Sequence, residues 1–197
     1  MFIHTDLLRA ALCCVADQKE ERRYLQGVNI TSTHIQATDG SCAVSMEHGS
    51  PDAFEGAFIF PGAIPAEAEG TYIKMLDDGA IVAEHVNGDN AVIHREIIES
   101  AGTHYPDFGK LMMLFESEPS PCKQQPIYQA RLLALPHRMF GESRLPVQLI
   151  SWGDGEMSRF IFDSVTNHFY GNPWLVVMPM KSNAFELLER LADEEGL

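Results

Sequence analysis

Histidines and carboxylates gather in the middle of the chain, where they could bind a metal ion or exchange protons. His85 and His94 fall on successive predicted strands and His104 follows soon after, with Glu84 and Glu96 close by. Metal sites use ligands at fixed short intervals, and neither HExxH nor a comparable spacing occurs here. Surface or strand histidines are therefore the favoured interpretation, and we expect no metal and no cofactor.

Nucleophilic chemistry has one candidate, Cys42, which lies just after Gly40 in a predicted turn. An activated thiol needs a base, and no partner histidine is identifiable. The paired acids Glu20–Glu21 and Asp77–Asp78 fall in predicted turns, where a hydrated surface is the usual explanation. The stretch "DDGAIVAEHVNGDN" lacks the glycine pattern and the following helix of a phosphate-binding loop. We therefore expect no catalytic residues and no enzymatic activity.

Residues 172–182, "NPWLVVMPMKS", point instead to adaptable apolar binding. Pro179 cannot donate a ladder hydrogen bond, so a strand through Trp174 should finish near it or lie at a sheet edge. Met178 and Met180 flank the proline, and flexible methionine side chains make a soft apolar rim. Taken alone, the stretch fits either a core strand that ends in Met-Pro-Met or the rim of a binding surface.

Composition and charge narrow the class of protein. The 197 residues are 45% hydrophobic and 21% charged, enough to bury a core in one large domain or two small ones. No apolar run approaches the roughly 20 residues of a membrane helix, and the N-terminus lacks the features of a secretory signal. The four cysteines lack disulfide-framework spacing. We expect a cytoplasmic protein with no membrane contact.

The net charge of −14 argues against a general nucleic-acid binder but leaves room for a local basic surface. Residues 182–197 hold five acids against the single base Arg190. Between Arg131 and Arg144 the balance reverses, because Arg138 joins these two arginines against Glu142 alone. The acidic end and this basic stretch are therefore candidates for mutual contact.

Hydrophobic periodicity predicts an α+β fold of repeated strand–helix–strands units that form antiparallel sheets with few helices. Residues 1–108 hold two such units: a strand at "MFIH", a helix over about 6–16, strand-like alternation from Tyr24 to residue 48, then "GAFIF", "TYIKML", "AIVAEHV" and "AVIHREII". The second unit's helix is degraded to "PGAIPAEAEG". Residues 109–126 read as a linker.

Residues 127–181 form a third unit, with a helix over about 129–140 that Pro136 must kink or shorten, followed by three strands. Residues 182–197 form an acidic amphipathic helix with Phe185, Leu188 and Ala192 along one face.

Three stretches resemble the bacterial DNA sliding clamp, the beta subunit of DNA polymerase III. "ERRYLQGVNITSTHIQATDGSCAVSM" is similar to the family's R-Y-x-L-N-G and A-T-D-G-H-R-L-A motifs, "HYPDFGKL" to F-P-D-Y-R, and "NPWLVVMPMKS" to the terminal Y-V-x-M-P-M-R-L. They occur in the family's order and cover residues 4–108 well, 127–181 moderately and the tail not at all. The chain resembles the middle domain plus the second half of the last domain.

Departures accompany the resemblance. Family clamps contain three domains of two units each, whereas this chain has about three units. Ser41, Cys42 and Ala43 stand where the family has His-Arg-Leu, so a charged and a branched side chain are lost.

The family's turn and M-P-M segment form a hydrophobic pocket for short peptides of polymerases and of other replication or repair proteins. The resemblance therefore implies a partner-peptide pocket in this chain, formed by Leu25, Thr38, Gly40, Ser41, Cys42, Ala43, Val176, Met178, Pro179, Met180 and Lys181. Methionine side chains would adapt to different peptides, and Lys181 would meet an acidic or carboxylate end.

Two functions remain open. The chain is either a sliding-clamp-like processivity or partner-recruiting factor, or a stand-alone clamp-derived binding module that does not encircle DNA. Encircling duplex DNA requires a closed homo-oligomer with a basic lining, whose candidates are Arg9, Lys19, Arg22, Arg23, Arg131 and Arg138.

The acidic tail follows the predicted rim directly, and a helix this short is marginal in water unless its apolar face is buried. We expect it to pack on its own chain or on a neighbouring subunit and to cover the pocket in part.

Overall fold

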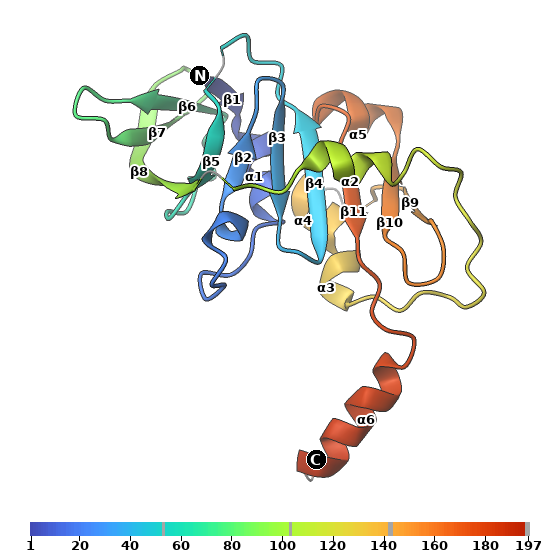
Figure 1. Cartoon of the computed structure of the whole chain (residues 1–197). Helices are drawn as coiled ribbons and strands as arrows, with labels where there is room; N and C mark the ends of the chain where they lie inside the picture. The colour runs from blue at the N-terminus through green and yellow to red at the C-terminus, as the bar shows by residue number, and fades with distance from the viewer. Residues whose placement is uncertain (53, 103, 142–143, 196–197) are drawn as a thin grey trace.

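The computed structural model describes residues 1–52, 54–102, 104–141 and 144–195, whose strands pair into one continuous sheet (Figure 1). The strands are β1 (Phe2–His4), β2 (Val28–Ile30), β3 (His34–Thr38), β4 (Cys42–Glu47), β5 (Gly56–Ile59), β6 (Gly70–Met75), β7 (Ile81–Val86), β8 (Val92–Gly102), β9 (Val147–Ser151), β10 (Ser158–Phe162) and β11 (Trp174–Val177). The α-helices are α1 (Thr5–Leu12), α2 (Phe108–Met113), α3 (Ala130–Leu133), α4 (Leu135–Phe140), α5 (Ser164–Phe169) and α6 (Ala184–Glu195).

The strands lie in the order β1-β6-β7-β8-β5-β2-β3-β4-β11-β10-β9, and every recorded pair is antiparallel. The first strand of each of the first two units joins the other unit, since β1 pairs with β6 and β5 pairs with β2. This exchange ties the two units into one body. The expected α+β fold with antiparallel sheets and few helices is confirmed.

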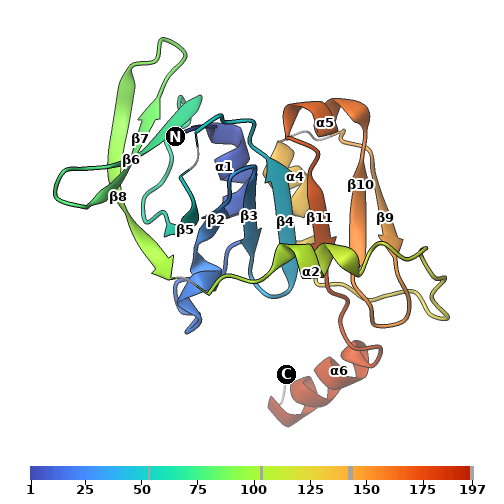
Figure 2. The same cartoon turned by 45° about the horizontal axis from the view of Figure 1, so that its top comes forward.

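The two faces of the sheet are covered differently. Helices α1 and α4 lie behind the central strands and α2 crosses in front of them in both views (Figures 1 and 2). The main core lies on the α1 and α4 side and includes Leu8, Ile35 and Leu175, none exposed to solvent. A smaller cluster on the other face joins Phe108 of α2 to Trp174 of β11.

The third unit is continuous with the first two through β4 and β11, where Cys42 faces Val177 and Ser45 faces Trp174. The strand β11 ends at Val177, as expected from Pro179. The predicted linker at 109–126 contains most of α2, whose N-cap Asp107 accepts a hydrogen bond from the Lys110 backbone N–H. Sequence alone did not indicate that helix.

Local differences from the sequence expectations have local causes. Residues 23–26 form a 3-10 helix and not the start of a strand, so the alternation from Tyr24 was misleading. The helix expected at 129–140 is two short helices divided at Ala134, two residues before Pro136. The first helix ends at Leu12 and is shorter than expected. Asp163 caps the unexpected α5 by accepting from the backbone N–H groups of Val165 and Thr166.

Candidate functional site

Strand pairing brings the turn at residues 38–42 beside the Met-Pro-Met segment. Ala43 lies opposite Val176 in the β4–β11 ladder, and the Met178 backbone N–H donates to the Ser41 carbonyl at 2.8 Å. Further on, the Met180 N–H donates to the Ile127 carbonyl at 2.7 Å. The segment after β11 is therefore fixed on both sides, by the turn and by the chain that leads into α3.

Asp39 holds the turn in place. Its Oδ1 accepts hydrogen bonds from the backbone N–H groups of Ser41 (2.7 Å) and Cys42 (2.8 Å) and from the Cys42 thiol, while Oδ2 accepts from Arg131 Nη1 at 2.6 Å. Burial opposes the charged form of Asp39, but these hydrogen bonds outweigh it and hold the pKa of its carboxyl below the ordinary value. The ionised side chain thus joins the first unit to α3.

A cavity of about 440 Å³ opens where the turn, α3 and the Met-Pro-Met segment meet. Five residues expected in the partner-peptide pocket line it: Ser41, Met178, Pro179, Met180 and Lys181. Its walls are mostly apolar, and its volume falls in the usual range for ligand pockets. We call this space the rim cavity.

The other residues expected in the pocket lie outside the lining of the rim cavity. Leu25, Thr38, Cys42, Ala43 and Val176 are each less than 8% exposed. Ala43 and Val176 belong to the cluster beneath α2, and Cys42 belongs to the main core. Gly40 takes a left-handed conformation (φ +85°) in the turn. The five buried side chains therefore support the turn and the strands from within the protein, whereas Gly40 is an exposed residue of the turn itself.

Five lining residues had not been anticipated: Gln129, Leu132, Ala184, Leu187 and Leu188. Leu132 is 1% exposed and ends at the cavity floor, whereas Leu187 and Leu188 come from α6. The helical spacing of apolar residues in 182–195 was visible in the sequence, but the resemblance stopped at Lys181. The tail was therefore expected to cover the pocket in part, but none of its residues was assigned to the lining.

The six candidate DNA-facing residues are largely engaged within the chain. Four form ion pairs: Arg9 with Asp6, Arg22 with Glu20, Arg23 with Glu99 and Arg131 with Asp39. Arg9, Arg131 and Arg138 lie on α1, α3 and α4, and α1 packs against α4. Lys19, Arg22 and Arg23 lie in and before the 3-10 helix. The positive charges of these four arginines are therefore neutralised in part by neighbouring carboxylates.

The histidine region contains a buried carboxylate–imidazole–hydroxyl chain. Glu96 Oε1 lies 3.2 Å from His85 Nε2, His85 Nδ1 lies 2.9 Å from Thr71 Oγ1, and Thr71 continues to Thr5 at 3.0 Å. Burial disfavours the ionised Glu96, yet hydrogen bonds from His85 and from the Gly62 N–H lower its pKa below the ordinary value. Thr71 and His85 are fully buried, so this chain of contacts resembles a catalytic triad without access for substrate.

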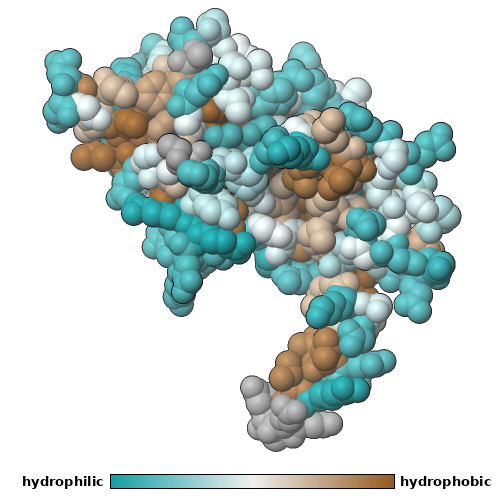
Figure 3. Space-filling model, in the orientation of Figure 1, coloured by the Kyte–Doolittle hydropathy of each residue, from teal (hydrophilic) through white to brown (hydrophobic). Residues whose placement is uncertain are grey.

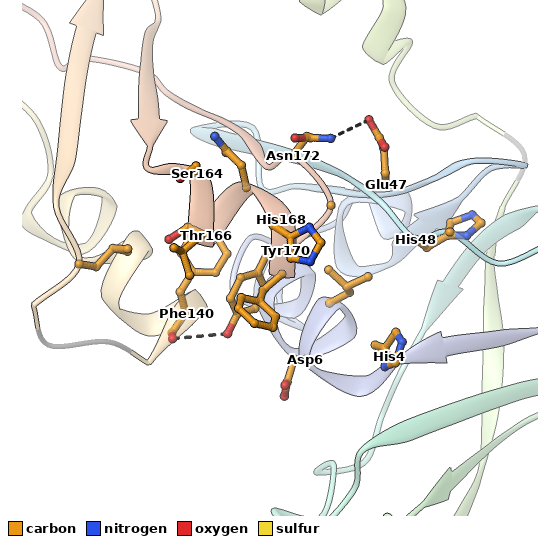
Figure 4. A pocket seen from close by; sticks show the side chains of 17 residues that line it. His4, Asp6, Glu47, His48, Phe140, Ser164, Thr166, His168, Tyr170 and Asn172 are labelled. Carbon is orange, nitrogen blue, oxygen red and sulfur yellow. Dashed lines mark hydrogen bonds between the residues drawn. The ribbon is translucent and has the colours of Figure 1, made fainter.

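A second cavity, of about 1120 Å³, lies between the start of α1 and α5 (Figure 4). His4, His48 and His168 line it together with Asp6 and Glu47. Their polar atoms serve local structure: the Ser50 backbone N–H donates to His48, Arg9 donates to Asp6, and Asn172 donates to Glu47. Thr166 in the same lining donates its hydroxyl to Asp163 Oδ2 at 2.7 Å, which belongs to the N-terminal cap of α5.

Two negative findings apply to the described part of the chain. No group of three or more histidine, cysteine or carboxylate side chains in it gathers closely enough to bind a metal ion. None of its helices has the length and apolar character required to cross a lipid bilayer.

The chain forms an antiparallel sheet of strand–helix–strands units that exchange strands, with an apolar cavity where the first and third units meet. Solved structures with the same fold are DNA polymerase III beta subunits. The putative subunit from Eubacterium rectale aligns with a TM-score of 0.56 at 11% identity, over 91% of this chain and 65% of that one. The subunit from Borrelia burgdorferi, determined in complex with a natural product, gives 0.56 at 14% identity, over 92% and 64%. The subunit from Thermotoga maritima gives 0.55 at 12% identity, over 90% and 63%.

The fold is therefore that of the DNA sliding clamp, and this chain is a shortened version of it. The sequence motifs had indicated the same fold. The chain spans less than two-thirds of the length of these structures. No protein-family model matches the sequence, and a search of curated proteins found no match.

Proposed function

We propose that this chain is a non-enzymatic, clamp-like protein that recruits replication or repair proteins by binding their short apolar peptides in the rim cavity. The observation that carries the proposal is the meeting of Ser41 with Met178, Pro179 and Met180 around an apolar space of about 440 Å³. Met178 is 38% exposed, so its side chain is available to a ligand. Lys181 stands at the edge, where it would meet a carboxylate of the peptide.

The buried state of the other polar groups supports a binding role over a catalytic one. The Glu96–His85–Thr71 chain is closed to solvent, and Cys42 is 4% exposed with its thiol directed at Asp39. An activated cysteine needs a base or a lowered pKa. A stoichiometric transition metal, or turnover lost on replacing one histidine, would contradict the non-enzymatic assignment.

Met178→Ala is expected to weaken peptide binding and leave the fold intact. A pocket of this kind binds with roughly micromolar affinity, about −8 kcal/mol, and removal of one apolar anchor costs on the order of 1–2 kcal/mol. Fluorescence anisotropy with a labelled short peptide bearing leucine and phenylalanine anchors measures this change. Met180→Ala should behave alike.

The matched control is Met75→Ala, because Met75 is 62% exposed on β6 and does not line the rim cavity. Met75→Ala should leave the dissociation constant unchanged. If the unmodified protein does not bind such peptides even at high micromolar concentration, the pocket assignment is wrong.

A second candidate function is processivity through a closed homo-oligomeric ring around duplex DNA. The fold and the position of Arg9, Arg131 and Arg138 on the helical side favour it, whereas the net charge of −14 opposes it. Native mass spectrometry, combined with retention on circular but not linearised DNA, separates a ring from a stand-alone binding module.

DNA binding, where present, is expected to be weak and to decline steeply between low and physiological salt. The acidic body repels phosphate, and four of the six candidate cations are already paired with carboxylates. A salt titration by gel shift or anisotropy with duplex DNA measures the slope. Tight binding that ignores salt would contradict this electrostatic account.

A further inference from the structure

The helix α6 leaves the body next to the rim cavity and extends into solvent (Figures 1 and 2). Its first turn is anchored: the Ala184 N–H donates to the Lys181 carbonyl at 3.0 Å, and the Ala184 side chain is 4% exposed. Beyond that turn, Phe185, Leu188 and Leu191 are 65%, 56% and 53% exposed. The tail was expected to pack on its own chain or on a neighbouring subunit and to cover the pocket in part; within this chain Ala184, Leu187 and Leu188 reach the rim cavity, and packing on a neighbouring subunit stays a prediction.

An apolar stripe runs along α6 and meets the rim cavity at its anchored end. Figure 3 shows this stripe as a brown band along one side of the helix. Ala184, Leu187 and Leu188 line the cavity opposite Leu132 and Met178. The cavity thus has two walls, one from the body and one from α6, and the exposed apolar stripe of α6 begins at this cavity.

We infer that α6 is a second binding wall, and that the rim cavity takes a partner peptide whose apolar anchors are followed by basic residues. This inference rests on the proposed function and specifies the partner. The apolar anchors occupy the space between Met178 and Leu188, and the rest of the peptide follows α6 outward.

Charge selects the occupant. Residues 184–195 hold five acids and one base, Arg190, so α6 carries a net charge of −4. Two copies of this helix side by side would bring ten acids together, and the whole chain repels its copies at a net charge of −14. A segment with lysine or arginine after its apolar anchors gains both hydrophobic burial and favourable electrostatics along α6.

Two cations near the rim cavity are already engaged in the body. Arg131 is committed to Asp39 at 2.6 Å, and the Lys181 carbonyl accepts the Ala184 N–H at the start of α6. The helix extends away from the body and leaves its apolar stripe available to a partner (Figures 1 and 2).

The test compares two leucines of the same helix in the full-length protein. Leu188 lines the rim cavity, whereas Leu191 does not and has similar exposure. With a short peptide that carries leucine and phenylalanine anchors followed by three lysines, Leu188→Ala should weaken binding by about fivefold. Leu191→Ala should change it by less than about twofold, since anchors deep in a pocket dominate binding. Circular dichroism checks that both variants keep their helix content.

A second measurement tests the charge. Replacing the three lysines of the probe by glutamates should weaken its binding at low salt. The double variant Glu186→Gln/Glu189→Gln should reduce that difference between the two probes, because it removes acids of α6 without touching Leu188. The two probes therefore show whether the acids of α6 contribute to binding or only its apolar side chains do.

The outcomes separate the two proposals. Absence of any binding to the unmodified protein overturns the pocket itself. Equal, unchanged binding by Leu188→Ala and the unmodified protein leaves the pocket intact and overturns the role of α6. Tighter binding by Leu188→Ala identifies α6 as a lid, and a native dimer mass that disappears with this substitution identifies a second copy as the occupant; either result also overturns the inference.

Discussion

Gly171→Ala is expected to be the most destabilising single methyl addition that the structure indicates. A Cβ atom at Gly171 would lie 1.9 Å from the carbonyl oxygen of Glu47, a backbone atom that cannot turn away. Gly171 also has φ of +59°, a left-handed conformation that costs an L-residue roughly 1–2 kcal/mol. The same residue accepts the Glu47 N–H at 2.7 Å, so relief of the clash would break this hydrogen bond.

The clash and the backbone strain together should lower the free energy of unfolding by about 3–5 kcal/mol. For a chain of this size that corresponds to a fall in Tm of roughly 6–20 °C. Differential scanning calorimetry measures the change.

Gly79→Ala is the matched control, because Gly79 has φ of +86° but no heavy atom within 4 Å of its added Cβ. Its free energy of unfolding should fall only by the cost of the left-handed backbone conformation, about 1–2 kcal/mol. If both variants lose the same stability, the close approach of Gly171 to Glu47 has no energetic consequence, and the segment after α5 lies further from the end of β4 than these distances indicate.

Replacing Glu96 by alanine should cost about 1–3 kcal/mol, because it removes the carboxylate from the buried donor His85 Nε2, and a buried unsatisfied group costs this much. The Gly62 N–H, which lies 2.7 Å from Glu96 Oε2, would also lose its partner, but Gly62 is exposed and water can replace it. Urea unfolding followed by tryptophan fluorescence measures the loss. An exposed carboxylate on the same strand, Glu99, provides the control, and Glu99→Ala should cost less than about 1 kcal/mol.

The same carboxylate gives a pH dependence with a definite sign. The pKa of Glu96 is lower in the folded protein than its ordinary value, so the unfolded chain takes up the proton first as pH falls. Its contribution to stability is present above the unfolded-state pKa of about 4.3 and is lost as pH falls through the lower folded-state pKa.

The unmodified protein should therefore be more stable than the Glu96→Gln variant at neutral pH. The difference between their free energies of unfolding should shrink as the pH falls through this window. Other carboxyls titrate equally in both proteins, so the difference between them isolates Glu96. A gap that stays constant between neutral pH and the acid limit of folding would show that Glu96 is not stabilised in its ionised form.

The sequence predicted those parts of the fold that depend on short-range signals. The turn at Thr38–Gly40 was visible because Asp39 and Gly40 meet a local requirement, and β11 ended where Pro179 required. The helix α5 carried an equally local signal, since Asp163 caps it, but the preceding run "MSRFIF" drew the prediction toward a continuous strand. The alternation at Tyr24 had the spacing of a strand while the backbone formed a 3-10 helix.

The candidate site was less accessible from sequence because it depends on contacts between distant segments. Met178 to Lys181 and Ser41 came from the resemblance, which supplied their proximity without a physical derivation. The tail was expected to cover the pocket in part, but Leu132 and Leu188 were not assigned to its lining, since no local pattern specifies which residues of α3 and α6 approach the same space. The paired state of the arginines was equally invisible, because Arg131 meets Asp39 across 92 positions of sequence.

The pairing of β4 with β11 makes residues 114–129 a tether, in the sense used for linked binding modules. The third unit does not find the first by diffusion; the chain holds it within reach at an effective concentration on the order of millimolar. The β4–β11 ladder is short, with four residue pairs, and within one chain it is sufficient to keep the sheet continuous. Separation of the third unit would therefore require loss of the β4–β11 ladder together with the contacts of this segment, such as the Lys123 N–H with Asp154 at 2.8 Å and the Trp152 indole N–H with the Ser117 carbonyl at 2.8 Å.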